Sequence, residues 1–167
     1  MLIDWDSPLR FHSTTLEPST TRGIPLPYYG NYGGPGNSGP GPALSDLDKL
    51  YQAHDDAYDQ AGEDISAQSA ADVTLIKSIF ELDTQGGLSD PEDSIYAGFS
   101  TLAIVGNLAL HSDLDLLLDL LGAELPLVIA NAIENLETGF AEEPSEGRSL
   151  HGAVHVFEKH FLDDLLL

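Results

Sequence analysis

His54 and Asp55 stand side by side in the segment HDDAYD, and their types and spacing favour chemistry. Adjacent residues of a helix point about 100° apart, so His54 can face a substrate while Asp55 faces a neighbouring loop. An imidazole backed by a carboxylate can take a proton from water, and a nearby divalent cation assists attack on an ester. The segment therefore predicts a hydrolytic site with a general base and a metal ion.

A glycine-rich segment, YYGNYGGPGNSGPG, runs from Tyr28 to Gly41 and precedes the His-Asp pair. So many glycines raise the entropic cost of ordering the chain. Their presence indicates that the backbone itself is needed there, for a tight turn or for a close approach. Main-chain carbonyls and a bidentate carboxylate are ligands that Ca²⁺ prefers. We therefore expect this segment, together with Asp55, to bind calcium.

Asp72 is the expected partner of His54. It falls on a largely apolar stripe of a second helix, formed by Ile65, Asp72, Leu75, Ile76, Ile79 and Leu82. A buried carboxylate is costly unless it is paired. An imidazole on the neighbouring antiparallel helix would pair with it, and the carboxylate would orient that imidazole. The alternative is that Asp72 points into solvent, as many mid-helix aspartates do.

The pattern of apolar residues predicts a mainly α fold. A first helix should begin after Ser45, a good N-cap, and end at Gly62. Further helices are expected at about 66–82, from Ser94 or the acids before it to about 110, then at 112–122, 124–137 and 148–167. No strand pair and no repeat is evident. We expect one domain with an extended arm (1–27), a catalytic core (28–110) and a C-terminal helical extension packed on that core (111–167).

The overall charge limits the classes of partner. The chain has 167 residues, no cysteine, and a net charge of −22 from 28 acidic and 6 basic residues. Such a field repels nucleic acid and anionic membranes and attracts metal cations. It indicates either adaptation to high salt or an ordinary solvated acidic surface. The start of the chain does not resemble a signal peptide, and its apolar stretches are typical of core helices, so a soluble protein is expected.

The segment YGNYGGPG, followed by DLDKLYQAHDDAY, resembles the calcium loop and active-site helix of secreted-type phospholipases A2. The strings GPGN and HDDAYD are especially similar to the cysteine-poor microbial members and to the phospholipase domain of parvovirus capsids. The resemblance covers roughly residues 27–79, and no counterpart is found beyond about Leu82. It implies a calcium loop, two antiparallel catalytic helices, and cleavage of the sn-2 ester of glycerophospholipids.

The resemblance also implies roles for individual residues. The carbonyl oxygens of Tyr32, Gly34 and Gly36 would bind calcium together with Asp55. His54 would be the general base that activates water. Asp72 would orient His54, Tyr58 would hydrogen-bond Asp72, and the amide of Gly34 would stabilise the oxyanion.

The chain departs from the family at its cysteine positions. Gly33 and Tyr51 stand where the family has the two cysteines that join its loop to its helix, and Leu50 and Ala57 replace other helix cysteines. The loop is therefore not joined covalently to the helix.

The expected activity is a calcium-dependent phospholipase A2 that acts on a phospholipid membrane or micelle surface, preferably a zwitterionic one, and not on nucleic acid. One alternative is a non-catalytic lipid-binding or structural module with the same fold. Another is the lipase domain of a membrane-attacking effector or of a capsid protein, exported by a non-classical route or carried in a virion or toxin.

Two features of the last expected helix have a simpler interpretation. His151 and His155 are four residues apart and could share a metal ion, but no third ligand is evident, so structural or solvated histidines are favoured. An apolar stripe on the same helix could rest on lipid, although packing on the core is favoured. It comprises Leu150, Val154, Phe157, Phe161 and Leu165.

Overall fold

The structure is a computed structural model that describes residues 3–4, 10–11, 18–19, 24–25, 28–34, 36–109 and 114–142. In this part of the chain the architecture is mainly helical, as the sequence predicts. The helices are α1 (Asp46–Ala61), α2 (Ile65–Thr84), α3 (Pro91–Asn107), α4 (Leu114–Leu121), the 3₁₀ helix η2 (Gly122–Glu124) and α5 (Leu125–Glu142).

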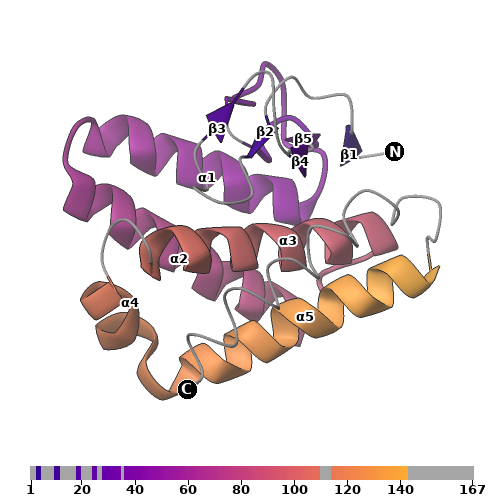
Figure 1. The fold of residues 1–167 in the computed structure, drawn as a ribbon. Helices are drawn as coiled ribbons and strands as arrows, with labels where there is room; N and C mark the ends of the chain where they lie inside the picture. Colours follow the sequence, from indigo (N-terminus) through magenta and orange to yellow (C-terminus); the bar gives the residue numbers. More distant parts are fainter. Residues whose placement is uncertain are drawn as a thin grey trace.

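The helices form two packed pairs. A short connection joins α1 to α2, which lie against each other, and α3 packs along most of α5. Helix α2 also contacts α3, α4 and α5 and so lies at the centre of the assembly. Figure 1 shows the short N-terminal strands above one end of α1, close to the start of α3. The pair that carries His54 and Asp72 therefore rests on a helical support.

Helix boundaries follow from local capping. The Ser45 side chain accepts a hydrogen bond from the Asp48 amide at 3.0 Å and so begins α1. Gly62, with φ of 56°, donates its amide to the Tyr58 carbonyl and ends the helix. Asp90 caps α3, and Pro91 occupies the first turn, where no amide donor is needed. The third helix thus begins with the acids that precede Ser94.

Two glycines allow α3 and α5 to pack closely. A Cβ atom on Gly98 would lie 2.4 Å from the carbonyl oxygen of Ala132, and one on Gly139 would lie 2.8 Å from that of Pro91. The backbones therefore approach to a distance that no larger residue permits. The core is continuous from the start of α1 to α5. Its largest fully buried side chains are Tyr29, Leu47, Ile76, Ile79, Ile95, Leu108, Leu117 and Leu136.

The expectation of no paired strands was wrong. Strand β1 (Ile3–Asp4) pairs antiparallel with β5 (Tyr28–Tyr29). Strand β2 (Arg10–Phe11) pairs with both β3 (Pro18–Ser19) and β4 (Ile24–Pro25). Each strand has only two residues, which is too short to show the alternation of apolar and polar side chains that identifies strands in a sequence.

One residue of the predicted apolar stripe of α2 is exposed and does not face the core. Ile65 is 66% exposed, whereas Asp72, Leu75, Ile76 and Ile79 are buried. Ile65 is the first residue of α2, next to the loop that leads from α1, so little of the protein is available to cover it. The remainder of the stripe, including the aspartate, faces the core as expected.

The expected helix at 148–167, its apolar stripe, and both His151 and His155 lie outside the described residues. In the described part of the chain, no helix has both the length and the apolar character that crossing a membrane requires.

Candidate active site

His54, Tyr58 and Asp72 meet between α1 and α2. The Nε2 atom of His54 lies 2.8 Å from Oδ1 of Asp72, and the Tyr58 hydroxyl donates to the same oxygen at 2.8 Å. The ring centroids of His54 and Tyr58 are 4.5 Å apart. The Asp72 residue is only 5% exposed. The sequence-based prediction that Asp72 is buried and paired with His54 is confirmed.

This contact determines which imidazole nitrogen is free to accept a proton. An ionised carboxylate only accepts hydrogen bonds, so the Nε2 atom of His54 must carry the hydrogen. In the neutral imidazole, Nδ1 then presents its lone pair. That atom lies 4.0 Å from Oδ1 of Asp55. The nitrogen that could act as a base therefore faces the region of Asp55.

Asp55 has a buried oxygen that lacks a partner. Its Oδ2 atom makes no hydrogen bond within the described residues, although the atom is buried. Burial raises the pKa of Asp55, and Asp59 and Asp56 add repulsion, while Ser38 and His54 oppose the shift. An unpaired buried carboxylate oxygen is costly, and a bound cation would satisfy it.

The described residues of the glycine loop (28–34 and 36–41) lie beside α1, and their backbone has the freedom that a carbonyl cage requires. Gly34 and Gly36 have φ of 110° and 78°, values that other residues rarely adopt. The Gly34 carbonyl accepts a hydrogen bond from the Asn37 amide at 3.0 Å, and a carbonyl oxygen retains a second lone pair. The ligand types present, main-chain carbonyls and the Asp55 carboxylate, are those that an oxygen-binding cation such as Ca²⁺ prefers.

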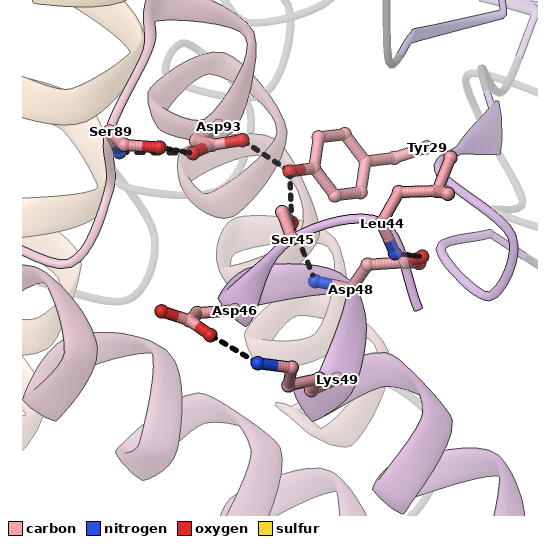
Figure 2. Close-up of polar contacts among 8 residues, drawn as sticks. All are labelled: Tyr29, Leu44, Ser45, Asp46, Asp48, Lys49, Ser89 and Asp93. Atoms are coloured by element: carbon pink, nitrogen blue, oxygen red, sulfur yellow. Dashed lines mark hydrogen bonds and ion pairs between the residues drawn. The ribbon is translucent and has the colours of Figure 1, made fainter. Parts of the chain in front are cut away.

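Asp48 holds the glycine loop onto α1. It is fully buried, and its carboxylate accepts main-chain hydrogen bonds from Asn31 at 3.0 Å, Tyr32 at 2.9 Å and Leu44 at 2.8 Å. The contact with Leu44 is visible in Figure 2. A Cβ atom on Gly30 would lie within 2.6 Å of this carboxylate, so only glycine fits there. Asp48 stands in the first turn of α1, where any acid is favourable for the helix dipole, but its contacts make it a structural anchor.

The far end of the loop is tied to the same helix by Tyr32. Its hydroxyl donates to the carbonyl of Gly41 at 2.7 Å and accepts from the Gln52 side chain at 3.0 Å. Asn31 adds a contact to the Pro42 carbonyl at 2.8 Å. Although no disulfide bond joins it to α1, the loop is fixed near both of its ends.

The loop-facing residues of α1 follow a spacing that sequence reasoning missed. Asp48, Gln52 and Asp55 are four and three residues apart, which places them on one face. Leu47, Tyr51, His54 and Tyr58 form the adjacent face, toward α2 and the core. The i, i+4, i+7 spacing of polar residues, which begins at Asp48 and ends within HDDAYD, was the available signal.

The candidate cation site depends on main-chain oxygens and a single carboxylate. Within the described residues, no group of three or more acidic or histidine side chains is placed to hold a metal ion. Comparison of the chain with protein-family models, with curated proteins and with solved structures found no significant match.

Proposed function

We propose that the chain is a calcium-dependent phospholipase A2, which hydrolyses the sn-2 ester of glycerophospholipids at a zwitterionic membrane or micelle surface. The observation that carries the proposal is the geometry around His54. Asp72 holds one ring nitrogen at 2.8 Å, and the other faces Asp55, which has a buried oxygen without a partner. The resemblance of the loop and of HDDAYD to this superfamily supports it.

The proposed calcium ligands are the carbonyl oxygens of Tyr32, Gly34 and Gly36 and the carboxylate of Asp55. When bound, the ion supplies positive charge that polarises the ester carbonyl and stabilises the oxyanion. The loop contributes its backbone and the helix contributes the charge, so neither alone makes the site.

The chemistry of the chain's own residues is base catalysis. Nδ1 of His54 takes a proton from water as the water oxygen bonds to the ester carbonyl carbon. The bond from that carbon to the glycerol oxygen then breaks, and the imidazolium returns the proton to the departing oxygen. Asp72 and Tyr58 keep the ring in the required orientation, and the Gly34 amide donates to the developing oxyanion.

The activity test uses phosphatidylcholine vesicles, with mass spectrometry of the products. With calcium present, the wild type should release the sn-2 fatty acid and leave a lysophospholipid. His54→Gln should lower the rate by about 10² or more, because glutamine cannot act as the base. Circular dichroism should show the fold unchanged. Lys49→Gln is the matched control, because the Lys49 ammonium group is exposed and pairs with exposed Asp46 on the same helix; it should retain full activity.

Two results would contradict the proposal. Hydrolysis that persists in EDTA would exclude the metal-dependent mechanism, and hydrolysis by His54→Gln would exclude the base. If the wild type binds vesicles without cleaving them, the lipid-binding module is the correct interpretation.

A further inference from the structure

The first turn of α3 contacts the beginning of the glycine loop, although 64 residues separate them along the chain. The buried Tyr29 hydroxyl donates a hydrogen bond to Oδ1 of Asp93 and lies 2.7 Å from the Ser45 hydroxyl. The other Asp93 oxygen accepts from the amide and the hydroxyl of Ser89, both at 3.0 Å. Figure 2 shows the Tyr29 hydroxyl between Asp93 and Ser45, the N-cap of α1.

Aromatic packing reinforces this contact. The ring of Tyr29 stacks on that of Tyr96, also from α3, with centroids 5.0 Å apart and planes 22° apart. Tyr51 of α1 meets both rings edge-on, at 6.0 Å and 5.4 Å. A Cβ atom on Gly33 would lie 3.0 Å from the Tyr96 ring. Helix α3 therefore contacts the loop at two residues, Tyr29 and Gly33.

Tyr29 connects α3 to the candidate cation site. Its amide and carbonyl pair with those of Gly33, both at 2.8 Å, directly before the predicted ligand Gly34. Ser45 also accepts from the amide of Asp48, which holds the loop amides of Asn31 and Tyr32. Displacement of the Tyr29 ring would therefore disturb the loop from both sides.

We propose that Asp93 and Tyr29 are positioning residues, through which α3 holds the glycine loop in the conformation that binds a cation. The part that concerns calcium rests on the proposed function. Since no disulfide bond joins the loop to α1, the ordering of the loop before the ion binds depends on these side chains. An ion that binds only the ordered loop loses affinity when the ordered fraction falls.

The variants are Tyr29→Phe, Asp93→Asn and the double variant. Asp83→Asn is the matched control, because Asp83 accepts from Asn131 at 2.5 Å and Asn135 at 3.1 Å and so joins α2 to α5 away from the loop. Two quantities are measured for each: the calcium Kd by calorimetry, and the exchange rates of the Asn31 and Tyr32 amides without calcium by NMR. Both are measured at a temperature where circular dichroism shows every variant folded.

We expect each single variant to weaken calcium binding by about tenfold. The double variant should be little worse than the weaker single one, because the two groups act as a unit. The Asn31 and Tyr32 amides should exchange faster, while amides in the middle of α2 should not. Asp83→Asn should lower the melting temperature but leave both the Kd and the loop amides unchanged.

Unchanged exchange of the loop amides in Asp93→Asn would overturn the inference, as would a calcium Kd that rises equally in the Asp83→Asn control. If the wild type binds no calcium, the proposed function fails, and the exchange measurement alone then decides the positioning role. Selective acceleration at Asn31 and Tyr32 would support that role, and uniform or absent acceleration would contradict it.

Discussion

At the residue scale, two carboxylates on the same helix have different surroundings: Asp48 is fully buried, whereas Asp55 is partly exposed. Asp48 has its oxygens satisfied by three main-chain amides, whereas one oxygen of Asp55 is buried without a partner. A satisfied buried carboxylate stabilises a local structure, and an unsatisfied one is available for a ligand. Asp48 therefore supports the loop, and Asp55 is the residue that we propose binds a cation.

Replacement of Asp48 by asparagine should destabilise the protein by about 1–3 kcal/mol. Asparagine offers one acceptor oxygen in place of two, so at least one of the three amides would face an NH₂ group. Urea unfolding followed by circular dichroism would measure the change. Asp46→Asn is the control, because Asp46 is exposed on the same turn and pairs with the exposed Lys49; it should change stability by less than about 0.5 kcal/mol. Equal effects of the two variants would contradict the anchoring role.

At the element scale, contacts between different helices and the loop place the residues of the candidate site. The contact of His54 with Asp72 could be predicted, because an aspartate on an apolar stripe needs a partner on the facing helix. The role of Asp48 was hidden by its place in the first turn, where any acid is favourable for the helix dipole. The contact of Tyr29 with Asp93 joins residues 64 positions apart, and no local pattern reports such a pair. The two-residue strands were missed because they are shorter than any detectable periodicity.

The buried tyrosines between α1 and α3 should make the fold sensitive to alkali. Burial raises the pKa of Tyr51, and the charges of Asp48 and Asp93 add to this, while its hydrogen bond with Ser100 opposes it. The unfolded chain releases this proton near pH 10, whereas the folded chain retains it. The resulting stability is therefore complete below about pH 10 and is lost progressively above it, by up to about 1.4 kcal/mol per pH unit.

Unfolding free energies measured between pH 8 and 11 would test this. Tyr51→Phe should show a shallower decline above pH 10 than the wild type, because it has no proton to release there. Ser100→Ala removes the same 2.5 Å hydrogen bond but keeps the phenol, so it should retain the wild-type slope. Parallel declines in Tyr51→Phe and the wild type would show that Tyr51 does not account for the effect.

At the scale of the whole molecule, the net charge of −22 attracts cations to many places. Weak, non-specific calcium binding is therefore expected for any such surface, and it is screened by salt. The proposed site is more specific, since it holds one ion at the glycine loop. That ion would be held by main-chain oxygens and Asp55 beside the imidazole that activates water. A test must separate this site from the general field.

Calorimetric titration of calcium in about 0.15 M salt, where exposed charges are screened, tests the central claim most directly. The wild type and His54→Gln should each bind one equivalent. Asp55→Asn should lose that equivalent, because it removes one of the two carboxylate oxygens. Asp46→Asn lowers the negative charge by the same amount on the same helix and should bind as the wild type does. Equal binding by Asp55→Asn and Asp46→Asn, or no saturable equivalent in the wild type, would contradict the account.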